Sequence, residues 1–273
     1  MSLADGNLLA VHIVGLQYDI CWEDKASSQD RMDRMLKAAA PPPGSLLVMP
    51  ELGDVGFSRN LEAILDERSE AWATETARTY QCWLQHGWAE PSQQPGRAWN
   101  VMATIAPSGE VIDRYRKVFT FNPGGEHLCF DAGEDLHLVE INSTVVCPLL
   151  CYDLRFPELF RLAARAGAEV FTVSASWPAV RSAHWLALVR ARAIENQAWL
   201  VGVNRTGSDP HLDYDGQSCI VSPLGEEVAR LGCEAGLLEA TLDLEQLRSW
   251  RRQLPALADI QPRLLGSLSI VRH

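Results

Sequence analysis

One segment constrains this chain more than any other: an apolar strand followed directly by a cysteine and then by a helix that starts at a proline. Residues 145–150 are apolar and rich in strand formers, and Pro157 has the fixed φ angle that suits the first position of a helix. Cys151 is therefore expected on the turn between them, at the carboxyl edge of a sheet, where open α/β folds bind ligands. Backbone N–H groups near such a turn favour a thiolate and a developing oxyanion. Cys151 is thus a candidate nucleophile, although a cysteine in this position is more often an inert hydrophobic residue.

The composition is that of an ordinary globular protein, and it argues against several classes of partner. The 273 residues are 47% hydrophobic and 22% charged, which predicts one domain over residues 1–273 with a sizeable core. The formal net charge of −11 argues against nucleic acid or an anionic membrane surface as a partner. We find no apolar run long enough to span a bilayer and no secretory signal, and the seven cysteines lack metal-binding spacing. We therefore expect a cytoplasmic protein with free thiols, no membrane contact and no metal.

Strands and helices alternate in the first and middle parts of the sequence, and strands pair as hairpins elsewhere. Strands are expected at residues 9–17, 46–49, 82–88, 99–106, 110–115, 136–141, 144–150, 170–173, 198–203, 217–221, 228–231 and 237–242. Helices are expected from an N-terminal cap at Ser28 to residue 39, through residues 71–80, after Pro157, and over residues 182–196. Residues 119–135 are predicted to form a loop, and the chain beyond Leu244 a helix followed by an irregular tail. The pattern predicts an α/β fold of mixed sheets covered by helices.

Three of the expected strands deliver a chemically useful side chain at their ends, namely Glu51, Lys117 and Cys151. A carboxylate, an ammonium and a thiol are the groups that amide hydrolysis needs as a base, an oxyanion partner and a nucleophile. Taken singly, Glu51 and Lys117 are equally well explained as solvated side chains. Cys147 is a second thiol on the strand before Cys151, but its place inside that strand indicates core packing.

The residues around these three positions resemble the motifs of a known family. The matching segments are residues 49–51, 56–58, 115–117, 151–158, 176–178, 184–185, 190–197 and 203–209. They resemble the nitrilase superfamily of carbon–nitrogen hydrolases, and within it the omega-amidases. The likeness is greatest to the bacterial YafV-like branch, whose second glutamate lies in a Gly-Glu-His context like that of residues 125–127. The chain departs from the superfamily at residues 119–121, where Phe-Thr-Phe replaces the common His-Leu-Phe.

The resemblance implies a fold and a role for each matching residue. The fold is an α-β-β-α sandwich, usually a homodimer formed through helices next to the site, without metal or organic cofactor. Cys151 would attack the amide carbon, while Glu51 would take the thiol proton, protonate the departing ammonia and then activate water. Lys117 and the backbone N–H of Tyr152 would hold the oxyanion. Glu126 would position Lys117 and the substrate nitrogen.

The substrate implied by the resemblance is a small linear amide with a carboxylic or 2-oxo acid at its other end, such as 2-oxoglutaramate. A deaminated glutathione amidase, an N-carbamoyl amine hydrolase and a catalytically idle scaffold are the alternatives. Candidate substrate-binding residues are Trp177 as a pocket wall, Arg181 as the partner of a carboxylate, and His184 at the start of a helix. Each of the three is also explained by a place in the core or on the solvated surface. Asp153 and Arg155 are expected to fix the turn rather than to react.

Overall fold

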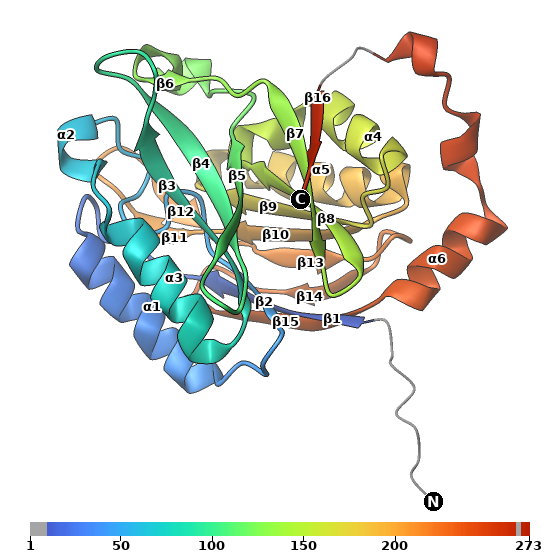
Figure 1. Ribbon diagram of the computed structural model, residues 1–273, viewed down its shortest axis with the longest axis horizontal. Coiled ribbons are helices and arrows are strands. Elements are labelled where there is room, and N and C mark those ends of the chain that lie inside the picture. Colours follow the sequence, from blue (N-terminus) through green and yellow to red (C-terminus); the bar gives the residue numbers. More distant parts are fainter. Residues whose placement is uncertain (1–9, 266–268) are drawn as a thin grey trace, which may run out of the picture.

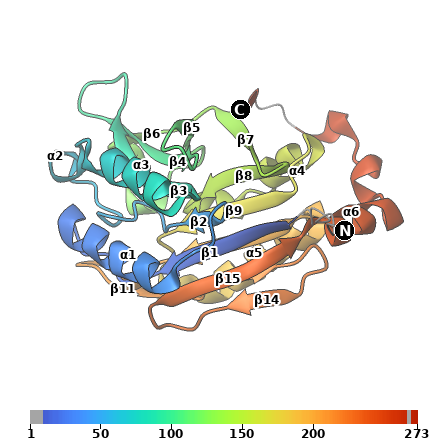
Figure 2. The ribbon, with the colours of Figure 1, turned by 60° about the horizontal axis from the view of Figure 1, so that its bottom comes forward.

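Two β-sheets face each other in the middle of the molecule, and helices cover the outer face of each sheet (Figure 1). The computed structural model describes residues 10–265 and 269–273. Seen from a second side, most strands lie between the blue and cyan helices on one side and the yellow and red helices on the other (Figure 2). The α-β-β-α sandwich expected from the sequence is confirmed.

The first sheet mixes parallel and antiparallel neighbours. Its strands are β1 (Ala10–Gln17), β2 (Leu46–Val48), β3 (Trp83–Pro91), β4 (Ala98–Ile105), β5 (Val111–Arg116), β6 (Phe130–Asp131) and β15 (Gly236–Asp243). Their order across the sheet is β15-β1-β2-β3-β4-β5, with β6 beside β4. The hairpin expected over residues 107–109 is confirmed as the antiparallel pair β4 and β5. In this order β5 lies at one end of the sheet, and it also contacts β7 of the second sheet (Asp135–Ile141).

The second sheet carries the cysteine turn near its middle. Its strands are β7 (Asp135–Ile141), β8 (Thr144–Leu150), β9 (Val170–Ala175), β10 (Trp199–Asn204), β13 (Cys219–Val221), β14 (Glu227–Arg230) and β16 (Ser269–Arg272). Their order is β14-β13-β10-β9-β8-β7-β16, and a separate pair is formed by β11 (Thr206–Ser208) and β12 (Asp213–Asp215). The central strands β8, β9 and β10 are parallel, so their carboxyl ends meet at one edge.

Each sheet is covered by a pair of long helices. The helices are α1 (Lys25–Ala39) and α3 (Arg68–Tyr80) on the first sheet, α4 (Pro157–Arg165) and α5 (Ser182–Asn196) on the second, and α2 (Leu61–Ile64) and α6 (Leu244–Gln253) at the periphery. The predicted helix start at Pro157 is confirmed. Within residues 10–265 and 269–273, no helix is long and apolar enough to cross a membrane.

Strand β1 shows why the inner strands are apolar on both faces. Val11 and Ile13 belong to the core between the two sheets, whereas Val14 and Leu16 belong to the core between the first sheet and α1 and α3. Because successive side chains of a strand point to opposite faces, a strand between two packed layers needs apolar residues at both sets of positions. Burial of these residues is what holds the layers together.

Helix α1 begins earlier than expected. The cap is Asp24, whose side chain accepts a hydrogen bond from the backbone N–H of Ser27 at 3.1 Å. Ser28 lies inside the first turn, where its hydroxyl oxygen instead accepts from the backbone N–H of Cys21 at 3.0 Å. The expectation of a cap at Ser28 is therefore wrong. Both Asp24 and Ser28 are residue types that cap helices, and the helix begins after Asp24.

Two segments expected to be irregular contain regular structure. Residues 119–135 include the 3₁₀ turns η1 (Asn122–Gly124) and η2 (Glu126–Leu128) and the short strand β6. The tail returns to the second sheet as β16, which pairs in parallel with β7. Both segments owe their structure to contacts with residues distant in sequence, which local periodicity does not show.

Gly15 on β1 lies close to β10 of the second sheet, and its replacement tests the packing between the sheets. A Cβ at Gly15 would lie 2.8 Å from Cγ2 of Val203 on β10. We expect Gly15→Ala to lower the free energy of unfolding by about 1–3 kcal/mol, measured by urea denaturation, because the added methyl group would overlap the buried side chain of Val203. The matched control is Gly232→Ala, whose Cβ would meet nothing within 4 Å. Equal stability of the two variants would contradict the close packing.

Candidate active site

The ends of four strands, two from each sheet, meet at one cavity. Glu51 follows β2, Lys117 follows β5, Cys151 follows β8, and Ser176 follows β9. All four residues line the same cavity of about 250 Å³. The structure therefore brings together the acid, the cation and the thiol that the sequence placed at three separate strand ends.

A buried lysine lies between two carboxylates at the floor of this cavity. Lys117 Nζ lies 2.7 Å from Glu51 Oε1, and 2.9 Å and 3.1 Å from the two carboxylate oxygens of Glu126. Asn100 on β4 donates from Nδ2 to Glu51 Oε1 and to Glu126 Oε1, each at 2.9 Å. The backbone N–H of Phe121 also donates to Glu126. All four charged and amide side chains are buried, so each carboxylate depends on these donors for its solvation.

The ion pairs with Glu51 and Glu126 keep Lys117 protonated. Burial alone would lower the pKa of its ammonium, but the carboxylates of Glu126 and Glu51 outweigh burial and raise that pKa. Lys117 is therefore a permanent cation at neutral pH and can stabilise a developing negative charge. It is not a candidate for a general base.

Cys151 occupies a strained turn and holds a neutral thiol. Its φ angle of 40° is in the left-handed region, which is unusual for a residue other than glycine. Burial raises the pKa of the Cys151 thiol well above its usual value, and the Glu51 carboxylate raises it further. Lys117 and the backbone N–H of Ser176 act in the opposite direction without reversing the shift. The sulfur therefore needs a base to become a nucleophile, and Glu51 is the carboxylate placed to act as one.

Glu51 is held in position from both sheets. One carboxylate oxygen accepts from Lys117 and Asn100, while the other accepts from the backbone N–H of Ser176 at 3.2 Å. The hydroxyl of Ser176 also donates to the backbone carbonyl of Glu51 at 3.3 Å. These contacts tie Glu51, which follows a strand of the first sheet, to the end of β9 in the second sheet.

Asp153 joins that turn to the loop after Lys117, as a turn-fixing residue was expected to do. Its carboxylate accepts from the backbone N–H of Leu150 at 3.0 Å, the backbone N–H of Phe119 at 2.9 Å, and the hydroxyl of Tyr115 at 2.7 Å. Burial raises the pKa of Asp153 to about 7, although Lys117 and these three donors act in the opposite direction. One side chain thus connects the end of β5 with the end of β8.

Two arginines, Arg155 and Arg181, line the same cavity. Arg155 lies over the Trp177 ring at 4.6 Å, and Arg181 over the Phe121 ring at 5.3 Å, measured from each guanidinium carbon to the ring centroid. Burial lowers the pKa of Arg155, and the nearby charge of Arg181 lowers it further. Among the described residues, neither guanidinium forms an ion pair with a carboxylate, which leaves two positive charges for an anionic group in the cavity.

The other expected residues are placed as follows. Tyr152 and Trp177 line the cavity, and the indole N–H of Trp177 donates to the backbone carbonyl of Arg181 at 2.9 Å. The backbone N–H of Tyr152 belongs to the first turn after β8, where N–H groups have no partner within the turn. His184 lies outside the residues that line the cavity, and its Nδ1 is 3.4 Å from both terminal nitrogens of Arg155.

Two residues of this site were not assigned to it from the sequence. Asn100 lies in the middle of β4 and outside every motif, so only the alternation of that strand hinted that its side chain faces inward. Arg155 belongs to the motif after Cys151, but it was interpreted as a turn residue because its place at the cavity depends on how the turn folds back over Trp177.

Comparisons with known proteins agree with this geometry. The sequence model of the carbon–nitrogen hydrolase family matches residues 11–252. A 2-oxoglutaramate amidase from Bacillus subtilis is 32% identical, covering 91% of this chain and 97% of the relative. The omega-amidase YafV of Escherichia coli K12 is 33% identical, covering 89% of this chain and 94% of the relative.

Solved structures give the same result. A carbon–nitrogen hydrolase superfamily protein from Xanthomonas campestris, with an arsenic adduct in its active site, superposes with a TM-score of 0.86 at 27% identity, covering 94% of this chain and 99% of the other. An amidase of the nitrilase superfamily from Nesterenkonia AN1 superposes with a TM-score of 0.81 at 27% identity, covering 93% and 95%.

The raised pKa of Asp153 predicts a pH-dependent stability. The usual pKa is 3.8 and the folded value about 7, so between these the folded state keeps a proton that the unfolded state releases. The stability from this group is fully present below pH 3.8 and is lost as the pH rises to about 7, at about 1.4 kcal/mol per pKa unit. We expect the stability of the unaltered protein relative to Asp153→Asn to fall across this window in urea denaturation. A difference that stays constant with pH would contradict the assignment.

Proposed function

Because this chain belongs to the carbon–nitrogen hydrolase family and is an amide-hydrolysing enzyme, we propose that it releases ammonia from the terminal amide of a small linear carboxylic or 2-oxo acid. The observation that carries the proposal is the buried cluster of Glu51, Lys117 and Glu126 at the cavity that Cys151 lines. Arg155 and Arg181 line the same cavity and form no ion pair within the part of the chain that the structure describes. The relatives named 2-oxoglutaramate amidase and omega-amidase support this substrate class.

The proposed chemistry begins with transfer of the thiol proton of Cys151 to Glu51. The sulfur then forms a bond to the amide carbon, and the carbonyl oxygen becomes an oxyanion that Lys117 and the backbone N–H of Tyr152 stabilise. Glu51 returns the proton to the nitrogen as the carbon–nitrogen bond breaks, which releases ammonia and leaves a thioester on Cys151. Water, deprotonated by Glu51, attacks the thioester, and the proton passes back to the sulfur as the acid leaves. Glu126 holds the ammonium of Lys117 and accepts from the substrate nitrogen.

The electrostatics of the site support this division of roles. A thiol whose pKa is raised is almost entirely neutral at pH 7, so attack requires a base next to it. Lys117 keeps its charge because two carboxylates surround it. Loss of one oxyanion donor typically costs roughly 3–4 kcal/mol in catalysis, so the fixed ammonium is a large part of the expected rate enhancement.

The second end of the substrate is assigned to Arg155 and Arg181. A guanidinium binds a carboxylate through two parallel N–H donors, and this geometry is stronger than a neutral hydrogen bond. The two arginines line the cavity from the η3 turn (Cys151–Arg155) and the η4 turn (Ala179–Arg181). A linear acid would therefore lie with its amide at Cys151 and its carboxylate between the arginines. His184, which contacts Arg155, would orient that guanidinium rather than touch the substrate.

We propose a cytoplasmic homodimer with the catalytic domain over the whole chain. All seven cysteines are free thiols, which suits a reducing compartment. Ile194 on α5 is 48% exposed and lies against the turn at Gly225, beside Leu224, which is 44% exposed. This apolar surface next to α5 suits contact with a second copy through helices near the site.

Replacement of the nucleophile tests the mechanism. Cys151→Ala should reduce ammonia release to background, because no other group can form the thioester, while the far-UV circular dichroism spectrum and Tm stay the same. The control is Cys233→Ser, which changes an exposed thiol and should keep full activity. Substantial turnover by Cys151→Ala would disprove the proposed chemistry.

A substrate panel tests the proposed specificity. The panel contains 2-oxoglutaramate, 2-oxosuccinamate, the matching monoamides without the oxo group, deaminated glutathione, an N-carbamoyl amine and neutral propionamide. We expect the highest kcat/KM for a short 2-oxo acid amide. Arg181→Ala should raise KM for that substrate by about 10–100-fold, since a charged hydrogen-bond partner is lost, without changing KM for propionamide.

The control for that experiment is Arg165→Ala, which removes an exposed arginine on α4. If Arg181→Ala raised KM equally for charged and for neutral amides, Arg181 would only support the fold. A clear preference for deaminated glutathione or the N-carbamoyl amine would replace the proposed substrate with one of these alternatives.

A further inference from the structure

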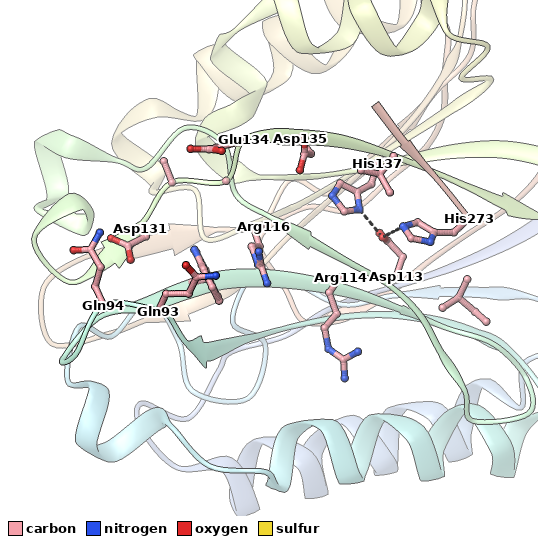
Figure 3. A pocket seen from close by; sticks show the side chains of 15 residues that line it. Gln93, Gln94, Asp113, Arg114, Arg116, Asp131, Glu134, Asp135, His137 and His273 are labelled. Atoms are coloured by element: carbon pink, nitrogen blue, oxygen red, sulfur yellow. Dashed lines mark hydrogen bonds and ion pairs between the residues drawn. The ribbon is translucent and has the colours of Figure 1, made fainter. Parts of the chain in front are cut away.

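A second cluster of ionisable side chains lies outside the active site. Asp113 on β5, His137 on β7 and His273 after β16 point toward one another at the edge of a separate cavity (Figure 3). One ligand atom from each residue lies within 4.8 Å of the others. The cluster connects the end strand of the first sheet with the two end strands of the second.

Regular backbone pairing places these side chains. His137 is paired with Val271 in the parallel register of β7 and β16. The backbone N–H of His273 donates to the carbonyl of Leu138 at 3.2 Å, and its carbonyl accepts from the N–H of Glu140 at 3.4 Å. His273 is therefore held on the sheet by the same ladder that carries His137, and its imidazole is positioned by strands rather than by a loop.

One polar atom of this cluster, Oδ2 of Asp113, lacks a hydrogen-bond partner among the described residues. Asp113 is 3% exposed, and its Oδ1 lies 2.5 Å from His137 Nδ1 and 3.2 Å from His273 Nε2. The other carboxylate oxygen, Oδ2, is buried and has no hydrogen-bond partner among the described residues. A buried carboxylate oxygen without a partner is costly and rare in folded proteins, so it points to a missing ligand.

We propose that Asp113, His137 and His273 bind a divalent transition-metal ion, with Zn²⁺ the best match. Two imidazoles and one carboxylate are ligands that suit zinc and disfavour the oxygen-binding ions calcium and magnesium. In a tetrahedral site with bonds of about 2.0 Å, neighbouring ligand atoms are roughly 3.3 Å apart, so small side-chain rotations bring these three atoms into place. A water from the adjoining cavity would complete the coordination.

The surroundings favour a cation in this place. Glu134 and Asp135 line the same cavity and add negative charge near His137 (Figure 3). Of the arginines that line it, Arg114 is paired with two glutamates, and Arg116 is stacked 3.6 Å from the centroid of a tryptophan ring. Both guanidinium groups therefore already interact with other side chains, which reduces their repulsion of a cation at the cluster.

A metal here would be structural and separate from the hydrolysis. It would link the two sheets at their edges and fix the tail strand β16. Asp113 also lies on the same strand as Tyr115, whose ring contacts His137 with centroids 5.8 Å apart and whose hydroxyl donates to Asp153. The ion would therefore support the strand that ends at Lys117, without contact with the substrate.

Metal binding to the full chain tests the proposal. Metal-free protein is titrated with ZnCl₂ by calorimetry and with CoCl₂ by absorption spectroscopy, and Tm is followed with and without Zn²⁺. We expect one high-affinity site per chain, a rise in Tm with Zn²⁺, and a tetrahedral Co²⁺ spectrum without the near-ultraviolet band of thiolate ligands. That last feature separates this site from the chain's free cysteines.

Variants assign the ligands. His273→Ala and His137→Ala should weaken Zn²⁺ binding by about 100-fold or more and abolish the Tm rise, whereas His12→Ala, on β1 away from the cluster, should behave like the unaltered chain. If His137→Ala does not fold, His273→Ala decides the question, because its side chain is 34% exposed. Absence of stoichiometric binding, a thiolate band, or unchanged affinity in His273→Ala would overturn the proposal.

Discussion

A lysine ammonium buried between two carboxylates is the interaction on which the rest of this structure depends. Moving such ions out of water costs several kcal/mol each, and removing any one partner leaves a buried charge uncompensated. Lys117 follows β5, Glu51 follows β2, and Glu126 lies in a 3₁₀ turn, so the cluster forms only when these separate segments are in place. Asn100 is needed because it gives both carboxylates a further donor.

The sandwich brings strand ends from both sheets to one cavity. Parallel neighbours β8, β9 and β10 bring their carboxyl ends to one edge, and the first sheet contributes Glu51 and Lys117 from the facing layer. Asp153 then joins the cysteine turn to the loop after β5 through three hydrogen bonds. Because Glu51 and Lys117 follow strands of one sheet and Cys151 follows a strand of the other, the packing between the layers sets the distances between the carboxylate, the ammonium and the sulfur. The apolar residues of β1 and its neighbours thus help to position the proposed catalytic groups.

Much of the fold could be predicted from the sequence, because many of its elements depend on short, local sequence patterns. Apolar runs predicted the strands, Pro157 predicted the start of α4, and residues 107–109 predicted the hairpin of β4 and β5. The missed features depend on distant partners. β16 forms by pairing with the edge of β7, which is distant in sequence. Asn100 belongs to the site because its side chain donates hydrogen bonds to two glutamates from other segments. The candidate catalytic positions were recognisable from motif resemblance, whereas the place of Arg155 at the cavity became visible only in the folded turn.

The raised thiol pKa of Cys151 has a consequence for the lifetime of the enzyme. Oxidants such as hydrogen peroxide attack the thiolate and hardly react with a protonated, buried sulfur. The burial that raises this pKa therefore also protects the resting sulfur from sulfenic acid formation. In the proposed mechanism the sulfur becomes reactive only when Glu51 takes its proton, which limits oxidative damage between turnovers.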